Sequence, residues 1–261
     1  VPLDLTIDLE QIARVTPGFS GADLKNLINE AAILAARESH DRIAPRHIEQ
    51  AQDKVLFGNR RTLLIKDAER HRLAVHEAGH TTVAFFMPHA DPPHKVTIIP
   101  HGHALGGTQQ LATEERHTLT EPYLHDRLAI LLAGRVAEQA LIGTLSSGAD
   151  DDIRQATRLA RNMVTRWGMS GQIGPIDLRD SDEHPFLGGE VARARHHSEA
   201  TARIVDEAVQ ALLNEASERA CALIKHHHEP MERLIKVLEQ RETLQREEIE
   251  RALSAPSSSH G

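Results

Sequence analysis

Apolar residues recur every three or four positions, the spacing of a helix, over the first sixty residues. Between Asp8 and Phe57 this pattern predicts three helices, and Ser20 with Asp23 three residues later resembles a capping box at the start of the middle one. The apolar stripe of that helix is Leu24, Leu27, Ile28, Ala31, Leu34 and Ala35. Pro45 suits the first turn of the third helix, where a missing N–H costs nothing. We therefore predict a small helical bundle.

A polar break at residues 58–61 separates this bundle from the rest of the chain. We place a domain boundary there, so that residues 1–60 form one domain and residues 61–253 a second. The remaining residues, 254–261, are rich in serine, and we expect a disordered tail. A length of 261 residues suits one large core with a smaller second domain.

A long helix is predicted from Asp67 to Phe86, ending before Met87-Pro88, because proline disfavours helix in the residue that precedes it. Residues 95–99 and 106–110 favour extended structure and are joined by a glycine-containing turn, which indicates a short hairpin. Helical spacing returns from Thr120 and ends at Gly143.

The next helix is predicted to start near Asp150 and to stop at Gly168. Its expected buried face is Ile153, Ala156, Ala160, Met163, Val164 and Trp167. Two or three further helices fill residues 190–253. The pattern as a whole predicts a mainly α protein with a small β element.

Composition narrows the possible partners and compartment. The balance of 40% hydrophobic and 26% charged residues is that of a soluble globular protein, and a net charge of -8 disfavours nucleic acid as a partner. No apolar run approaches the ~18 residues of a membrane helix, and no secretory signal is visible. The single cysteine, Cys221, has the flanks of a small buried hydrophobe and favours a reducing compartment.

Candidate chemistry centres on the sequence His-Glu-Ala-Gly-His at residues 76–80. Residues four apart in a helix share a face, so His76 and His80 can bind one metal ion. Glu77 is rotated by ~100° and can reach the open coordination position without becoming a ligand. Zinc lowers the pKa of a bound water toward ~7, and Glu77 would take the proton and deliver it to the leaving amine.

The bare motif is moderate support, because the chain contains 18 histidines. At this composition it arises by chance in roughly one sequence in ten. Gly79 adds weight, since glycine inside a buried helix usually marks a close backbone neighbour. A third ligand is also needed. Glu138 and the run Asp150-Asp151-Asp152 are both candidates, although three adjacent aspartates are more often a solvated helix start.

The other histidines suggest less specific roles. Residues 226–228 are three consecutive histidines near the carboxyl end of a predicted helix, where cations complement the helix dipole and no two share a face. A solvated helix end is therefore favoured over a metal site. His101 and His103 lie in the turn between the predicted strands, from which they could approach a substrate, and turn positions more often serve structure.

Four segments occur in the order found in FtsH, the membrane-anchored, ATP-dependent AAA+ zinc protease family. They are residues 16–24 (TPGFSGADL), the motif at 76–80, residues 94–100 (HKVTIIP) and residues 147–152 (SGADDD) followed by Ala156-Thr157. The chain resembles the carboxyl-terminal portion of that family from Asp8 to Leu253. The resemblance implies a helical AAA+ lid bundle at 1–60, followed by a helical protease domain with the β element at its active-site cleft.

The resemblance also implies roles for individual residues. His76, His80 and Asp152 match the metal ligands, and Glu77 matches the catalytic base. Glu138 matches a glutamate that we expect to orient a ligand histidine, although an exposed helix glutamate is an equal alternative. Gly106, Gly107 and Thr108 match an edge strand that binds substrate, and Gly107 replaces the bulkier residue often found there. Gly21 and Ala22 match lid positions at the nucleotide pocket.

The family implies one Zn²⁺ per chain and endopeptidase cleavage of unfolded membrane and cytosolic proteins in quality control. ATP and Mg²⁺ are expected only in a full-length protein, because no phosphate-binding loop precedes Asp8. A homohexamer is expected there, at the cytoplasmic face of the bacterial inner membrane or the equivalent organelle membrane. The membrane is reached only through a segment absent here, and this fragment is expected to be soluble. The alternative is a non-catalytic, zinc-stabilised ring scaffold.

Overall fold

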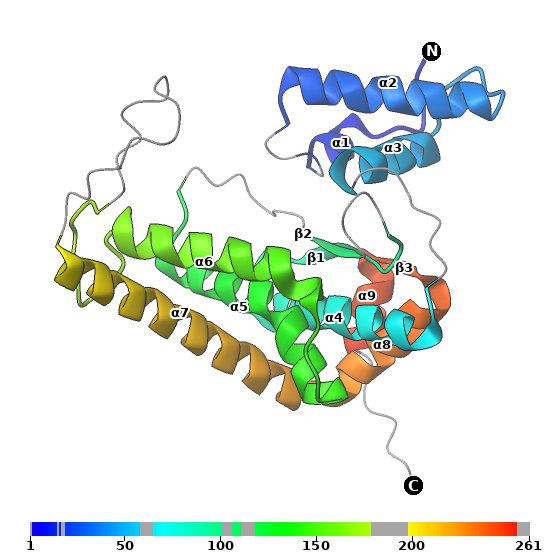
Figure 1. Ribbon diagram of the computed structural model, residues 1–261. Coiled ribbons are helices and arrows are strands. Elements are labelled where there is room, and N and C mark those ends of the chain that lie inside the picture. The colour runs from blue at the N-terminus through cyan, green and yellow to red at the C-terminus, as the bar shows by residue number, and fades with distance from the viewer. Residues whose placement is uncertain are drawn as a thin grey trace, which may run out of the picture.

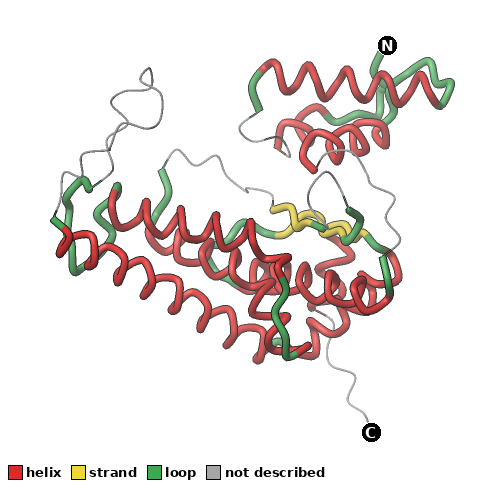
Figure 2. Tube along the Cα trace, viewed as in Figure 1, coloured by secondary structure: helices red, strands yellow, loops and turns green. Residues whose placement is uncertain are grey.

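The protein is mainly helical and has one small β-sheet (Figures 1 and 2). The computed structural model describes residues 2–14, 16, 19–57, 65–100, 106–110, 118–178 and 198–254. Buried apolar residues form two separate clusters, one within residues 27–51 and the other within residues 74–253. The predicted fold class is therefore confirmed. The polar break at 58–61, His101, His103 and residues 255–261 lie outside the described residues.

The amino-terminal cluster is built from α1 (Leu9–Arg14), α2 (Gly21–Arg37) and α3 (Pro45–Phe57). The capping box is confirmed, because Ser20 Oγ accepts from the Asp23 N–H and the Asp23 carboxylate accepts from the Ser20 N–H. One position of the predicted stripe is wrong. Leu24 is exposed in the first turn of α2, and the buried row begins with Leu27.

Helix α4 (Asp67–Phe86) lies at the centre of the larger cluster and ends where the sequence predicts, with Met87 in an extended conformation. Every residue from Ala74 to Ala84 is buried, so the second half of the helix has no solvent-facing side. It packs against α5, α7 and α8 and against the first two strands of the sheet. A helix enclosed in this way holds its polar side chains in fixed positions.

The sheet contains the predicted hairpin, β1 (Pro93–Thr97) and β2 (Gly107–Gln110), paired antiparallel. It also contains a strand that the sequence did not predict. Strand β3 (Thr243–Gln245) pairs antiparallel with β1, which gives the order β2-β1-β3. Three residues between two helices carry no readable alternation, so only the pairing with β1 identifies this strand. Strand β2 forms one edge of the sheet.

Helix α5 (Glu121–Ala137) packs against α4, α6 and α7. It continues without a break into a π-helical turn, η1 (Glu138–Ile142), which ends at Gly143. A π-turn widens the helix by one residue and is frequent at functional sites. Here it begins at the buried residue Glu138.

A short 3₁₀ turn, η2 (Ser147–Ala149), leads into α6 (Asp150–Thr165). Two of the residues predicted to be buried on α6 are not. Ile153 is 40% exposed and Trp167, which follows the end of the helix, is 39% exposed. The buried row runs at intervals of four through Ala156 and Ala160, and Asp152 rather than Ile153 continues it toward the helix start.

The carboxyl-terminal region contains α7 (Glu199–His226), α8 (His228–Arg241) and α9 (Arg246–Ser254). The three consecutive histidines do not lie within one helix, as the sequence suggested, but at a junction between two. The ring of His227 stacks on Phe86 at a centroid distance of 3.5 Å. Cys221 is half-buried and packs against the large cluster, in line with its predicted hydrophobic role.

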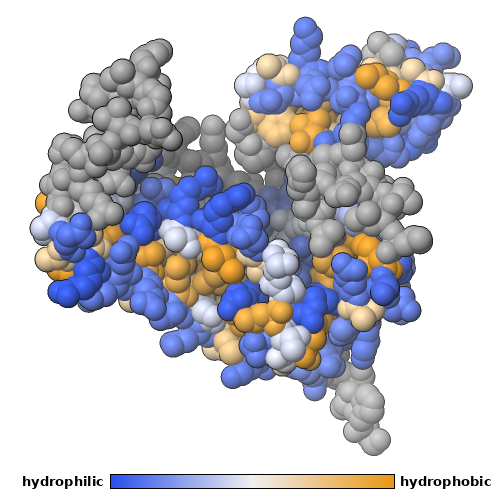
Figure 3. Space-filling model, viewed as in Figure 1, coloured by the Kyte–Doolittle hydropathy of each residue, from blue (hydrophilic) through white to orange (hydrophobic). Residues whose placement is uncertain are grey.

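Among the described residues, no helix is both long enough and apolar enough to cross a bilayer. On the face drawn in Figure 3, hydrophobic patches lie among hydrophilic residues over the region of α5 to α7.

Candidate metal centre

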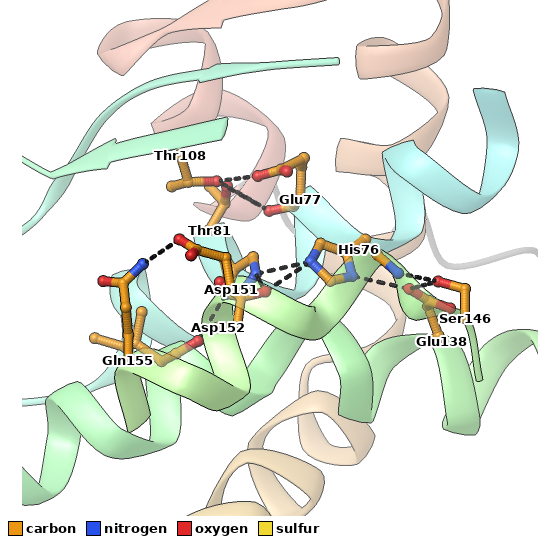
Figure 4. A network of polar contacts seen from close by, with 12 residues as sticks. His76, Glu77, Thr81, Thr108, Glu138, Ser146, Asp151, Asp152 and Gln155 are labelled. Carbon is orange, nitrogen blue, oxygen red and sulfur yellow. Dashed lines mark hydrogen bonds and ion pairs between the residues drawn. The ribbon is translucent and has the colours of Figure 1, made fainter. Parts of the chain in front are cut away.

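Three side chains from two helices meet at the point where α4 passes the start of α6 (Figure 4). The Nε2 atoms of His76 and His80 are 3.1 Å apart. The Oδ2 atom of Asp152 lies 3.1 Å from the first and 3.3 Å from the second. Both histidines are buried and the aspartate is partly buried. The structure therefore brings together the three residues that the sequence placed in one ligand set.

The other nitrogen of each ring fixes its tautomer. His76 Nδ1 lies 2.9 Å from Glu138 Oε1, and His80 Nδ1 lies 2.7 Å from the backbone carbonyl of Ile130. Both partners are acceptors, so each Nδ1 carries the hydrogen and, in a neutral ring, each Nε2 presents a lone pair. Two lone pairs and a carboxylate oxygen thus converge. A positive charge, either a proton or a metal cation, must lie among them.

The electrostatics of the cluster agree with this conclusion. Burial opposes the charged form of His80, but the hydrogen bond and charge of Asp152 outweigh it and raise the pKa of His80 to about 9. Burial would also raise the pKa of Asp152, yet its contacts with His76 and His80 hold that pKa well below its usual range. The site is built to attract a cation.

Space for an ion is left by Gly134 on α5. A Cβ atom at this position would lie 2.5 Å from Nε2 of His76 and 2.5 Å from Nε2 of His80. No side chain can occupy that volume while both rings keep their places. Two imidazole nitrogens and one carboxylate oxygen are a donor set that suits zinc. Three such ligands leave the fourth position of a tetrahedral zinc site open.

Close packing of the helices depends on a second glycine. A Cβ atom on Gly79 would lie 2.7 Å from the carbonyl oxygen of Ala133 and 2.7 Å from the Cβ of Ala137. The sequence predicted a close backbone neighbour at Gly79, and α5 is that neighbour. The contact holds the turn of α5 that carries Gly134 against the two histidines.

Glu77 lies on the same helix but points away from the three converging atoms, toward strand β2 (Figure 4). Its Oε2 accepts a hydrogen bond of 3.0 Å from the Thr108 hydroxyl, and its backbone oxygen accepts one of 2.8 Å from Thr81. Burial raises the pKa of Glu77, although His80, His76 and the hydroxyl of Thr108 act in the opposite direction. A buried carboxylate of raised pKa beside a cation site suits a proton acceptor.

Glu138 is buried at the start of the π-turn, so it is not an exposed helix glutamate. Its Oε1 contacts His76 on the side opposite the converging atoms, which makes it a hydrogen-bond partner of that ring. Burial opposes its charge, but hydrogen bonds from Arg72, His76 and Ser146 outweigh burial and lower the pKa of Glu138. Asp151, the residue before Asp152, pairs with Arg154 and Gln155 on the surface of α6.

The other predicted positions lie on two elements. Gly106 precedes β2 and lies beside Glu77, while Gly107 and Thr108 are the first two residues of that strand. Gly21 and Ala22 form the first turn of α2. Sequence reasoning missed Gly134 and Arg72. Gly134 lies four residues before Glu138, and this spacing places both on one helix face.

A second group of possible ligands, Glu38, His40 and His47, lies in the amino-terminal bundle. Its hydrogen bonds argue against a metal. His47 Nδ1 accepts from the Ala44 N–H, so its Nε2 carries the hydrogen that faces Glu38. The guanidinium of Arg46 also contacts both Glu38 and His40, and a fixed cation already satisfies the carboxylate.

Two family models match the chain. The model described as peptidase family M41 matches residues 63–252, and the model described as the AAA+ lid domain matches residues 6–50. An ATP-dependent zinc metalloprotease FtsH of Hahella chejuensis is 56% identical over 258 residues, which cover 99% of this chain and 42% of that protein. An FtsH 2 of Salinibacter ruber is 45% identical and covers 95% of this chain and 36% of its own length.

A further relative, an ATP-dependent zinc metalloprotease FtsH of Nitrosococcus oceani, is 44% identical over 96% of this chain and 39% of its own length. The chain therefore spans about two fifths of the length of these curated relatives. The family match extends over most of the chain and contains the residues that converge between α4 and α6. The chain belongs to peptidase family M41.

Proposed function

We propose that the chain is a zinc-dependent endopeptidase unit that cleaves unfolded polypeptides, with His76, His80 and Asp152 as the ligands of one Zn²⁺. The observation that carries the proposal is the convergence of two Nε2 lone pairs and one carboxylate oxygen, with both Nδ1 hydrogens committed elsewhere. The relatives are named zinc metalloproteases, which agrees with this ligand set. Bound zinc supplies a Lewis acid that polarises the peptide carbonyl and acidifies a water molecule.

The remaining residues act on protons and on substrate. Glu77 takes the proton of the attacking water and delivers it to the leaving amine, and no covalent intermediate forms. Glu138 holds His76 in the correct tautomer through its contact with Nδ1. Gly106, Gly107 and Thr108 lie beside Glu77 at the edge of the sheet, where a substrate segment can add as a further strand. Recognition through the backbone suits broad specificity.

We infer that residues 1–60 are an AAA+ lid and residues 61–253 the protease domain, because the two matched families and the two apolar clusters divide the chain in that order. Gly21 and Ala22 would face a nucleotide only in a longer protein that includes the ATPase core. ATP and Mg²⁺ would bind to that core. As the resemblance to the FtsH family implies, we propose that this longer protein is a membrane-anchored homohexamer that acts in quality control.

Replacement of the proposed third ligand tests the metal site. Asp152→Asn removes the negative charge that holds the cation, and zinc content after dialysis is expected to fall well below one per chain. Metal analysis of the purified chain is the measurement, with Asp151→Asn, one residue away and on the surface, as the matched control. A fully loaded Asp152→Asn variant would show that another group completes the site.

Cleavage of unfolded casein then separates the enzyme from the zinc-stabilised scaffold. Activity that a chelator abolishes and zinc restores would support the endopeptidase. One zinc per chain without cleavage of any unfolded substrate would support the scaffold. The comparison uses the chain as it stands, with the Asp152→Asn variant as the negative reference.

The acid limb of the pH profile tests the environment of Glu77. The carboxylate must be ionised to accept a proton, so kcat/KM falls as the pH drops through its pKa. The Thr108 hydroxyl donates to the ionised form and lowers this pKa. Thr108→Val is therefore expected to move the acid limb to higher pH, measured at saturating zinc. An acid limb that does not move, or that moves to lower pH, would contradict Glu77 as the titrating base.

A further inference from the structure

We propose that Arg72 is a positioning residue for the metal site, which it controls through Glu138 and the loop before α6. The proposal rests on the proposed function, because it concerns the strength with which the three ligands hold zinc. Arg72 lies one helical turn before His76 on α4, and its hydrogen bonds go to Glu138 and Thr144. These contacts show how it can act on the three ligands.

The carboxylate of Glu138 is held by three donors, two on α4 and one in the loop after η1. Its Oε1 contacts His76 Nδ1 at 2.9 Å and accepts from the Ser146 hydroxyl at 3.0 Å. Its Oε2 accepts from Arg72 Nη1 at 2.7 Å. The side chain of Glu138 is only 2% exposed, so water is largely excluded as a replacement donor. Arg72 is the charged partner among these three donors.

The same guanidinium binds the loop that follows the π-turn. Arg72 Nη1 donates to the Thr144 carbonyl oxygen and Nη2 donates to the Thr144 hydroxyl, each at 2.9 Å. Two residues later the hydroxyl of Ser146 accepts from the Gly148 N–H at the start of η2. This loop leads through η2 into α6, whose third residue is Asp152.

Arg72 and Glu138 thus connect both sources of ligands. Glu138 orients the ring of His76, and Figure 4 shows it between His76 and Ser146. Arg72 binds the loop at Thr144, and this loop sets the start of α6 and with it the position of Asp152. Loss of the guanidinium leaves a buried carboxylate without its cation and frees the 143–146 loop. The carboxylate then turns toward other donors, and His76 and Asp152 lose their fixed separation.

Arg72→Met keeps the length and the apolar stem of the side chain but removes its charge and donors. In the full chain we expect about tenfold weaker zinc binding, measured by competition with a chromophoric chelator. Arg72→Lys retains one charge but not the fork that reaches both Glu138 and Thr144, so an intermediate affinity is expected. Arg70→Met is the matched control, because Arg70 also lies on α4 but pairs with Glu242 at the end of α8. This variant should bind zinc like the wild type.

A double-mutant cycle with Glu138→Gln distinguishes positioning from a general loss of stability. If Arg72 acts through Glu138, adding Arg72→Met to Glu138→Gln weakens zinc binding much less than it does in the wild type. Circular dichroism of the chelator-treated variants checks that the metal-free fold is kept. If Arg72→Met fails to fold, the same cycle is run with Arg72→Lys.

Wild-type zinc affinity in Arg72→Met, or additive effects in the cycle, would overturn the positioning role. The proposed function fails in a different way. A wild-type chain that binds no zinc, or an Asp152→Asn variant that binds it fully, contradicts the ligand set whatever Arg72 does.

Discussion

Gly134→Ala is expected to abolish zinc binding and, with it, proteolysis. The added methyl group would lie 2.5 Å from Nε2 of both His76 and His80, closer than a carbon atom can approach a ring nitrogen. Zinc bonded to these nitrogens needs distances of about 2.0–2.1 Å, so methyl and metal compete for the same space. Alanine is otherwise the better helix former, and α5 itself should not be weakened.

The measurement is zinc content by atomic spectroscopy, with circular dichroism to establish that the helices remain. Gly171→Ala is the control, because a Cβ at Gly171 meets nothing within 4 Å among the described residues. A Gly134→Ala chain that retains one zinc would mean that α5 retreats from α4. That outcome would contradict the role of Gly134 as the space for the ion.

Glu77→Gln is expected to retain zinc and to lose at least ~10²-fold in kcat/KM. Glutamine has the size of glutamate, and its amide oxygen can still accept the hydrogen bond from the Thr108 hydroxyl at the position of Oε2. It cannot take a proton from water. The structure therefore predicts a separation of metal binding from catalysis, because Glu77 points toward β2 and not toward the three converging atoms.

Cleavage of casein and zinc content are measured on the same preparation. Glu69→Gln, a change of the same kind at an exposed position in the first turn of α4, is the matched control. Near-normal cleavage by the Glu77→Gln variant would rule out Glu77 as the base. A loss of zinc would instead assign Glu77 to the metal site.

Local signals in the sequence predicted the helical elements well. Helix α4 begins at Asp67 and ends at Phe86 as expected, because the proline at 88 acts on the residue directly before it. The capping box at Ser20 and the start of α3 at Pro45 are equally local. Each depends on residues within one turn of the boundary, so no tertiary contact is needed to predict it.

Signals that depend on distant partners were missed or misassigned. Strand β3 exists through its pairing with β1, some 150 residues earlier in the chain. Ile153 and Trp167 are exposed because the row that packs against α5 and α7 runs through Ala156 and Ala160. Hydrophobic spacing shows that a helix has an apolar face, but the neighbouring elements decide where that face begins and ends.

For the candidate site, the sequence by itself determined the pair His76 and His80, since helical geometry alone places residues four apart on one face. It also placed Glu77 beside them. Residue spacing left open which of Glu138 and the aspartates at 150–152 meets the open side of that pair, and only the family resemblance pointed to Asp152. In the tertiary structure Asp152 on α6 lies there, while Glu138 at the start of η1 contacts the opposite side of His76. The space at Gly134 and the contacts of Arg72 likewise depend on the packing of α5 against α4. Such contacts follow from how the helices pack, and the spacing of residues along the chain does not encode them.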